Sequence, residues 1–207
     1  EVENFPGFAT GVMGPELMES MRKQVERFDA KIITDDIVSM NLTGEIKELT
    51  DGSGNTVKAK SVILAMGSAY KEIGLPNEKR LSGRGVSWCA TCDGFFFREQ
   101  VIAVVGGGDS AMEEANFLTK FASKVVLIHR RDSFRASKIM VDRAAANPKI
   151  EFLFNHEVID VLGEEKVSGL KLKNTVTGEE SVKDFTGLFV AIGHLPRSEL
   201  VTGQVDL

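Results

Sequence analysis

The feature that most constrains the fold is a segment of about 30 residues in which two apolar runs flank a glycine-rich loop and a helical pattern. Val101–Val105 is an uninterrupted apolar run, as expected for a parallel strand that is covered on both faces. Residues 109–121 carry alanine and leucine at helical spacing, and Val125–Ile128 is a second apolar run. This βαβ pattern predicts an α/β fold with a Rossmann-like parallel sheet.

Residues 1–70 show a different pattern. A helix is predicted over residues 15–28, where Pro15 stands in the first turn and apolar residues fall on one face. Short β-type runs follow, separated by glycine and turn residues, and we expect a small meander that leads into one buried strand, Val62–Ala65. The runs are residues 31–34, 37–42, 45–50, 56–59 and 61–64.

Gly74-Leu75-Pro76 breaks the pattern and places a domain boundary near residues 70–76. After the βαβ segment, a helix is predicted over residues 135–146, and a second meander precedes the apolar run Leu188–Gly193. Its strands are predicted at residues 151–154, 157–163, 167–174 and 180–183. The predicted organisation is residues 1–70 as one domain, 71–195 as a Rossmann-like domain inserted into it, and 196–207 as a return segment.

The overall charge and hydropathy exclude several classes of function. The formal net charge is -5, which argues against a chain that mainly neutralises nucleic acid. No apolar run approaches the roughly 20 residues that span a bilayer, and the first residues lack the features of a signal peptide. These features predict a cytoplasmic chain without a nucleic-acid or membrane partner. The first residue is Glu1 and not Met, which suggests a fragment.

Gly106-Gly107-Gly108-Asp109-Ser110-Ala111 fits the pattern G-x-G-x-x-A. Such a loop needs a tight turn, a backbone that a pyrophosphate can approach, and a small residue where helix and strand cross. A plain strand-turn-helix corner is the alternative, but the strand before and the helix after the loop favour a dinucleotide site. The candidate cofactor-binding residues here are Gly106, Gly108, Asp109, Ser110 and Ala111.

The end of the second strand indicates which nucleotide is bound. It carries His129, Arg130 and Arg131, with Arg135 four residues later, where an NAD-preferring unit usually has an acidic residue. Guanidinium groups bind a 2'-phosphate bidentately, whereas a carboxylate repels it. NADPH is therefore predicted in preference to NADH. A solvated basic edge and a nucleic-acid patch are the alternatives.

The two cysteines of the chain, Cys89 and Cys92, lie three positions apart. Structural zinc needs four ligands, and none of the three histidines (His129, His156, His194) is paired with another, so no metal is expected. Two inert core thiols are the second alternative. The spacing allows a small-ring disulfide, and in a reducing compartment such a pair is more often redox-active. A redox pair is the preferred interpretation.

Phe95, Phe96 and Phe97 follow the cysteines directly. Three consecutive large apolar residues cannot all face one side of a regular element. At least one is therefore expected at a surface or cleft, and core packing and partner docking both remain open.

Together these motifs resemble the low-molecular-weight, bacterial-type thioredoxin reductases. The resemblance covers essentially all 207 residues, and the motifs occur in the order and spacing of that family. They are Glu3–Gly7, Gly83–Ser87, Cys89–Phe96, Gly106–Ala111, His129–Arg131 with Arg135, and Phe189–His194.

The resemblance implies that NADPH reduces FAD, that FAD reduces the cysteine pair, and that the pair reduces thioredoxin. It implies that Cys92 faces the flavin, that Cys89 attacks the disulfide of thioredoxin, and that Asp93 donates or accepts the proton. It also implies a homodimer and two alternating domain orientations, with hinges near residues 70–76 and 193–198.

The resemblance further assigns three groups of binding residues. Arg84, Phe95 and Phe96 match positions that contact thioredoxin. Ile192 and Gly193 are assigned to NADPH, and Asn4, Ala65 and Gly67 to FAD.

Two departures from the family pattern concern FAD. Met66 replaces the usual threonine of Ala-Thr-Gly, so a hydroxyl contact is lost. No glycine fingerprint precedes Glu1, and the flavin-binding segment that follows the NADPH domain in the family is missing. Residues 1–70 are therefore expected to be a partial FAD-binding domain. The alternatives are an NADPH-binding fragment without turnover and a related flavoprotein that acts on another partner.

Overall fold

The computed structural model describes residue 2 and residues 5–206 of the 207-residue chain. The chain divides into two compact units, which we call unit 1 (Glu1–Ala65 with Ser198–Leu207) and unit 2 (Met66–Arg197). Among the described residues, no helix is long and apolar enough to cross a membrane.

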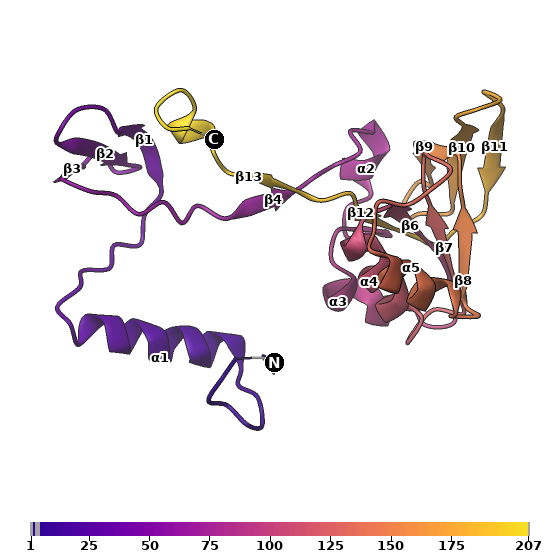
Figure 1. The fold of residues 1–207 in the computed structure, drawn as a ribbon, viewed down its shortest axis with the longest axis horizontal. Helices are drawn as coiled ribbons and strands as arrows, with labels where there is room; N and C mark the ends of the chain where they lie inside the picture. The colour runs from indigo at the N-terminus through magenta and orange to yellow at the C-terminus, as the bar shows by residue number, and fades with distance from the viewer. Residues whose placement is uncertain (1, 3–4, 207) are drawn as a thin grey trace. The chain divides into compact units, whose positions relative to one another are not determined.

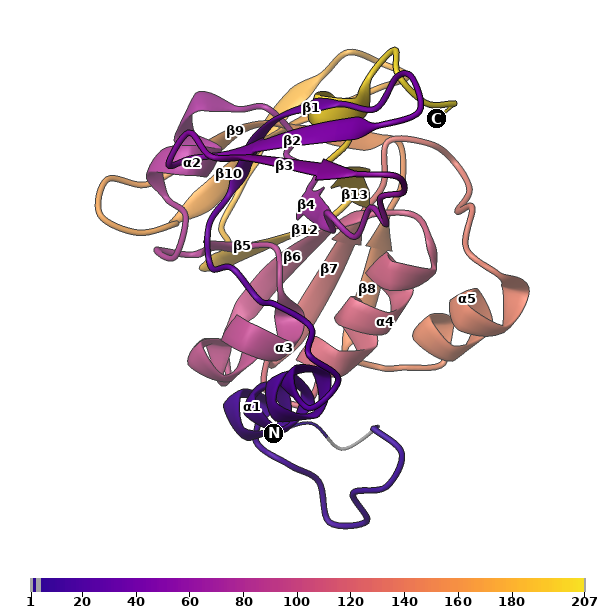
Figure 2. The ribbon, with the colours of Figure 1, turned by 90° about the vertical axis from the view of Figure 1, so that its left-hand side faces the viewer.

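Unit 2 is built on a five-stranded sheet in the order β5-β12-β6-β7-β8, and every neighbouring pair in it is parallel. The two apolar runs of the predicted βαβ unit are its adjacent strands β6 and β7, in register at Val104 and Leu127. Figure 2 shows β6, β7 and β8 side by side. The strands are β5 (Val86–Ser87), β12 (Gly187–Ala191), β6 (Val101–Gly106), β7 (Lys124–Ile128) and β8 (Ile150–Leu153).

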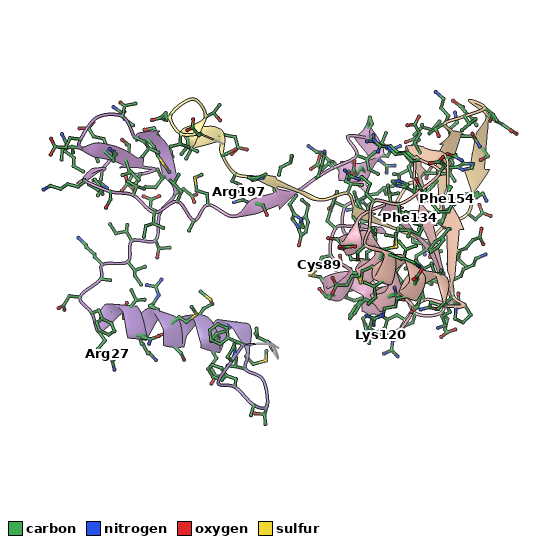
Figure 3. The ribbon with its side chains drawn as sticks, viewed as in Figure 1. Arg27, Cys89, Lys120, Phe134, Phe154 and Arg197 are labelled. Atoms are coloured by element: carbon green, nitrogen blue, oxygen red, sulfur yellow. A yellow bond between two sulfur atoms is a disulfide. The ribbon has the colours of Figure 1, made fainter. Side chains whose placement is uncertain are left out.

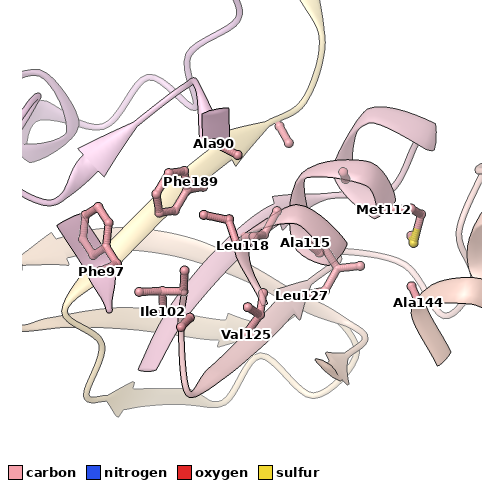
Figure 4. Close-up of a cluster of buried hydrophobic side chains, with 14 residues drawn as sticks. Ala90, Phe97, Ile102, Met112, Ala115, Leu118, Val125, Leu127, Ala144 and Phe189 are labelled. Carbon is pink, nitrogen blue, oxygen red and sulfur yellow. The ribbon is translucent and has the colours of Figure 1, made fainter. Parts of the chain in front are cut away.

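Helices cover one face of this sheet (Figure 1). They are α3 (Ala90–Asp93), a 3-10 turn (Gly94–Phe97), α4 (Asp109–Leu118) and α5 (Lys138–Ala145). Their apolar side chains form a buried core with the strands, drawn in Figure 4. The predicted helices over 109–121 and 135–146 are confirmed, although α4 ends and α5 begins three residues inside those bounds. The core includes Ile102, Val125, Leu127 and Phe189 from the strands and Ala115 and Leu118 from α4.

An antiparallel sheet, in the order β11-β10-β9, contributes the second buried cluster of unit 2. Side chains alternate along the strands, so Ile102 joins the helical core while Ala103 joins the cluster with Leu170 and Leu172. The Rossmann-like α/β class is therefore confirmed, and so are three strands of the predicted second meander. The strand predicted at residues 151–154 is not part of the meander, because it pairs in parallel with β7 as β8. The strands are β9 (His156–Leu162), β10 (Gly169–Asn174) and β11 (Glu180–Lys183), and the short helix α2 (Pro76–Arg80) lies beside β9.

The first and last segments of unit 2 pair with each other in a two-stranded antiparallel ribbon. It pairs β4 (Ser68–Tyr70) with β13 (His194–Pro196), and the Lys71 N–H donates to the Gly193 carbonyl at 3.0 Å. The ribbon adjoins the segments in which the family resemblance places hinges.

Unit 1 contains the helix α1 (Gly14–Glu26) and an antiparallel sheet in the order β1-β2-β3. Residues from Ser198 onward belong to this unit, because the Gln204 side chain accepts from the Leu42 N–H at 2.7 Å and donates to the Met40 carbonyl at 3.0 Å. The strands are β1 (Ile37–Asn41), β2 (Lys47–Asp51) and β3 (Thr56–Ala59), and a 3-10 turn spans Glu199–Val201.

Two predicted strands of unit 1 are wrong. Residues 31–34 and 61–64 are irregular, and the Ile63 side chain, predicted to be buried, is 95% exposed. An apolar run becomes a strand only where neighbouring backbone pairs with it and other elements cover it. The described residues of unit 1 offer the Val62–Ala65 run neither a pairing strand nor a covering helix.

The close contact between β12 and the phenylalanine run gives a test of the core. A Cβ on Gly187 would lie 2.8 Å from Cδ1 of Phe97, whose ring packs on Phe189 at 5.1 Å. We expect Gly187→Ala to lower the free energy of unfolding by about 1–3 kcal/mol, because the buried rings must shift. Urea unfolding followed by the fluorescence of Trp88, the single tryptophan, measures this.

Gly108→Ala is the matched control for that substitution. A Cβ there meets nothing within 4 Å, so the urea midpoint should stay close to that of the wild type. Equal midpoints for the two variants would contradict the packing argument.

Candidate functional site

The two cysteines form a disulfide directly after strand β5. The Ser87 hydroxyl accepts from the Cys89 N–H at 3.0 Å, and the Cys89 carbonyl accepts from the Asp93 N–H at 3.1 Å. The first turn of α3 thus begins at Cys89 and brings the sulfur of Cys92 back to it, with the two Cα atoms 5.3 Å apart. The sequence spacing and this local turn together account for the disulfide.

The two sulfurs have different surroundings. Cys89 is half-buried, and its Sγ accepts from the Cys92 N–H at 3.2 Å and lies 3.4 Å from the Thr91 hydroxyl. Cys92 is exposed, and Asp93 beside it is half-buried. Donors at Cys89 stabilise negative charge on that sulfur once the disulfide is reduced. Figure 3 labels Cys89 at the start of α3.

The phenylalanine run divides between core and surface, as the sequence predicted. Phe97 is buried, whereas the side chains of Phe95 and Phe96 are 56% and 71% exposed. Arg84, also assigned to the partner by resemblance, is exposed in the turn before β5, where its carbonyl accepts from the Val167 N–H at 2.9 Å.

The glycine loop joins β6 to α4. A Cβ on Gly106 would lie 2.5 Å from the Cβ of Ala111, so these two small residues allow the helix to pack closely on the strand. A Cβ on Gly108 would meet nothing within 4 Å. Of the three fixed positions of the G-x-G-x-x-A pattern, Gly106 and Ala111 are therefore closely packed, whereas Gly108 borders open space. A pyrophosphate needs this arrangement to approach the backbone, so NADPH fits the residues present.

The side chain of His129 packs against the glycine loop, unlike the exposed arginines that follow it in the sequence. It is buried, its ring occupies the space that a side chain on Gly107 would need, and it packs on Phe134 at 5.3 Å. Burial lowers its pKa, and the charges of Arg131 and Arg130 act in the same direction. A neutral His129 therefore supports the loop from below.

The arginine-bearing segment is attached to the glycine loop. The N–H groups of Arg135 and Ala136 both donate to the Gly107 carbonyl, at 2.8 and 3.1 Å. The Asp109 carboxylate accepts from the Ser137 N–H at 2.7 Å and from its hydroxyl at 3.0 Å. Sequence reasoning missed this structural role of Asp109.

The same segment is anchored by aromatic packing. The ring of Phe134 lies 4.9 Å from that of Phe152 and 4.6 Å from that of Phe154, and Figure 3 labels the first and last of these. The arginine side chains themselves are exposed, and within the described residues none of them makes an ion pair. They are Arg130, Arg131 and Arg135.

The remaining candidate residues lie in exposed connections or follow β12. Ile192 is half-buried, and Gly193 is exposed with φ of 105°. Both follow Ala191, the last residue of β12, which pairs with Gly106 at the start of the glycine loop. Ser110 is exposed in the first turn of α4.

The candidate FAD residues do not form an FAD site by themselves. Ala65 and Gly67 lie in an exposed connection, and Asn4 lies outside the described residues. In unit 1 the described residues contain no parallel sheet, and residues 106–111 carry the one G-x-G-x-x-A fingerprint of the sequence. The residues present therefore do not fit FAD without further chain.

Glu114 on α4 was not found by sequence reasoning. Its Oε2 is buried and has no hydrogen-bond partner among the described residues. Burial raises its pKa to about 7, with the adjacent Glu113 as a smaller cause. The one sequence signal that could have indicated the burial of Glu114 is its position, one helical turn before the buried Leu118.

The fold and site define a class of protein in which a dinucleotide loop and a disulfide are built on one parallel sheet. Residues 2–207 match the family model for pyridine nucleotide-disulphide oxidoreductases. The chain is 61% identical to a thioredoxin reductase of Streptomyces coelicolor, over all of this chain and 64% of that protein. It is 47% identical to a thioredoxin reductase of Rickettsia felis, over all of this chain and 68% of that protein.

Solved structures give the same result. A thioredoxin reductase of Lactococcus lactis in its FR conformation matches 98% of this chain and 66% of that chain, with a TM-score of 0.82 and 38% identity. The chain belongs to the pyridine nucleotide-disulphide oxidoreductase family, among its thioredoxin reductases. It spans 64% of the length of the Streptomyces coelicolor relative.

The buried carboxyl of Glu114 gives a pH-dependent test. In the unfolded chain Glu114 ionises near its ordinary pKa of 4.5, and in the folded chain near 7. Between these values the folded state binds more protons, so wild-type stability falls as the pH rises. Glu114→Gln removes this loss. From about pH 5 to about pH 8, we expect the free energy of unfolding of the variant to rise by roughly 1–3 kcal/mol relative to that of the wild type.

Urea unfolding of both proteins at the two pH values measures this gain. Glu113→Gln, a change at the exposed neighbour, is the control and should show a much smaller pH-dependent difference. A stability difference between Glu114→Gln and the wild type that stays constant with pH would contradict the assignment.

Proposed function

We propose that this chain supplies the NADPH-binding domain and the redox disulfide of an FAD-dependent reductase that acts on thioredoxin. One observation carries the proposal. Strands β5 and β6 lie in one parallel sheet, and Cys89 follows the first while Gly107 follows the second. The carboxyl ends of parallel strands share an edge, so the disulfide and the nucleotide loop stand at the same edge.

The overall reaction transfers two electrons. NADPH and one proton reduce the disulfide of thioredoxin to a dithiol, and NADP⁺ is released. FAD and NADPH are the cofactors of the flavoprotein reductases to which the chain is similar. We assign NADPH binding to residues 71–195, and we assign residues 1–70 and 196–207 to a partial FAD-binding domain.

NADPH binding is supported by an open loop and by unpaired charge. The backbone at Gly108 is accessible to a pyrophosphate, and exposed guanidinium groups follow the second strand. Arg130, Arg131 and Arg135 are free to bind a 2'-phosphate, because they form no ion pairs within the described part of the chain.

The step at the cysteine pair is thiol–disulfide exchange. In the reduced pair, the thiolate of Cys89 attacks one sulfur of the thioredoxin disulfide, and the other thioredoxin sulfur leaves as a thiolate. The Cys92 sulfur then attacks Cys89 in the mixed disulfide, which restores the Cys89–Cys92 bond and releases reduced thioredoxin. Asp93 is close enough in the chain to exchange the proton. The exposed Arg84, Phe95 and Phe96 are proposed to contact thioredoxin.

A cytoplasmic homodimer is part of the same proposal. A second candidate function is an NADPH-binding module without turnover, and the observation that favours it is that the described residues of unit 1 form no parallel sheet. Visible absorbance of the purified protein separates the two. A flavin band with thioredoxin-dependent NADPH oxidation supports the reductase, whereas colourless protein that binds NADPH without oxidising it supports the module.

Nucleotide choice is tested by removing single guanidinium groups. We expect Arg131→Ala and Arg135→Ala each to weaken NADPH binding by about 10–100-fold, because each removes a charge-assisted hydrogen bond to the 2'-phosphate. NADH binding should stay at the wild-type value. Isothermal titration of the chain with each nucleotide measures this, and Arg143→Ala on α5 is the control for losing an exposed arginine. Equal losses for NADH and NADPH would show that the arginines do not read the 2'-phosphate.

The roles of the cysteines are tested by single serine variants. The reduced chain is mixed with thioredoxin that keeps one active-site cysteine, joined as a mixed disulfide to thionitrobenzoate. We expect Cys92→Ser, which keeps the attacking Cys89, to displace the coloured thiolate at least about 10-fold faster than Cys89→Ser. The absorbance of the released thionitrobenzoate gives both rates. A faster reaction of Cys89→Ser would reverse the two roles.

A further inference from the structure

Four phenylalanine rings form a continuous cluster next to the disulfide. The ring of Phe95 lies 6.1 Å from that of Phe96 and 6.2 Å from that of Phe121, both edge to face. Phe121 in turn lies 5.7 Å from Phe117 on α4. The cluster therefore joins the segment after α3 to the end of α4.

Two cations lie on the faces of these rings. The guanidinium carbon of Arg98 is 4.3 Å from the centroid of Phe95, and the Lys120 Nζ is 4.7 Å from that of Phe117. Both residues are exposed, and neither makes an ion pair within the described residues. Cation–π contacts hold the charges in defined positions. We call these residues the cation–aromatic surface: Phe95, Phe96, Arg98, Phe117, Lys120 and Phe121.

This surface is rigidly attached to the redox site. A Cβ on Gly94 would lie 3.0 Å from Cδ2 of Leu118 and 3.3 Å from Cδ2 of Phe121, so the backbone after α3 packs directly on α4. Cys92 is two residues before Gly94 and three before Phe95. A protein bound to the surface is therefore placed beside the Cys89–Cys92 pair.

The charges around this surface restrict the partner. Glu99 is the adjacent acidic residue, and its N–H donates to the Phe121 carbonyl at 3.0 Å. Arg98 and Lys120 place two positive charges on the faces of the rings themselves, while the chain as a whole carries a net charge of -5. An acidic partner is repelled by most of such a chain and attracted here, which orients its approach. Exposed phenylalanines favour a protein partner over a nucleic acid, because aromatic anchors dominate protein interfaces.

We propose that the cation–aromatic surface docks an acidic face of the protein whose disulfide the Cys89–Cys92 pair reduces. Arg98 and Lys120 select the partner by charge and set the association rate, and the phenylalanines supply the buried contact. This inference rests on the function proposed above and extends its contact surface beyond Arg84, Phe95 and Phe96.

The test uses the 207-residue chain with Cys92→Ser as the parent, because Cys89 is then the one thiol. The probe is thioredoxin of Streptomyces coelicolor that keeps one active-site cysteine, joined to thionitrobenzoate. The Cys89 thiolate forms a bond to the thioredoxin sulfur, the bond to thionitrobenzoate breaks, and thionitrobenzoate leaves as the coloured thiolate. Neither FAD nor NADPH takes part in this exchange.

We expect Arg98→Glu and Lys120→Glu each to lower the second-order rate constant about 3–10-fold at low salt. The parent rate should fall as salt increases, and the double variant should lose most of that dependence. Arg98→Lys keeps the charge and should keep most of the rate. Lys183→Glu on β11, which belongs to the sheet of the other buried cluster, makes the same charge change and should react like the parent.

A second measurement controls for folding and sulfur reactivity. A small uncharged disulfide, 4,4′-dithiodipyridine, should react equally with the parent and with every variant, because it carries no charge for Arg98 or Lys120 to attract. If the parent reacts no faster with the thioredoxin conjugate than with this small disulfide, the proposed function fails. If the parent prefers thioredoxin but Arg98→Glu and Lys120→Glu match Lys183→Glu, the docking inference fails and the function stands. A change in oligomeric state of the double variant without a rate change would assign the surface to a second copy and overturn the inference.

Discussion

The close approach of α4 to the end of β6 is the contact on which the rest of unit 2 depends. Gly106 and Ala111 leave no room for larger side chains, since a Cβ on the first would lie 2.5 Å from that of the second. The helix can therefore start three residues after the end of the strand, and a Cβ on Gly108 between them would meet nothing within 4 Å. Because β5 runs parallel to β12 and β12 to β6, the disulfide after β5 stands at the same edge.

Polar groups buried near this edge carry a cost in stability. Nε2 of His129 beneath the loop and Oε2 of Glu114 on α4 are both buried without partners in the described structure. Each unpaired buried group costs free energy, and a domain tolerates few of them. With Nε1 of Trp88 after β5, three such atoms follow the strands at this edge, where a ligand site is expected, since functional sites accept such costs. The packed core on both faces of the sheet compensates for them.

The sequence predicted the parts of this structure that depend on short-range patterns. Ile102–Val104 and Val125–Ile128 are buried on both faces, so the hydrophobicity of these two runs alone identified them as parallel strands. The start of α5 was misplaced because the segment before it is held by tertiary contacts, such as that of Asp109 with Ser137. The strand predicted at Val62–Ala65 failed because pairing partners do not follow from a local run. Glu114 was missed because burial of one helical glutamate leaves no local pattern.

The two proposed binding surfaces lie at opposite ends of α4. Its first turn, at Asp109, belongs to the nucleotide loop, and the chain just after its last turn carries Lys120 and Phe121. A helix of 10 residues is about 15 Å long, so about this length of α4 lies between the two surfaces. The disulfide-bearing α3 runs beside this helix between them. The proposed nucleotide and protein contacts therefore use different residues of α4, although both depend on the packing of this one helix.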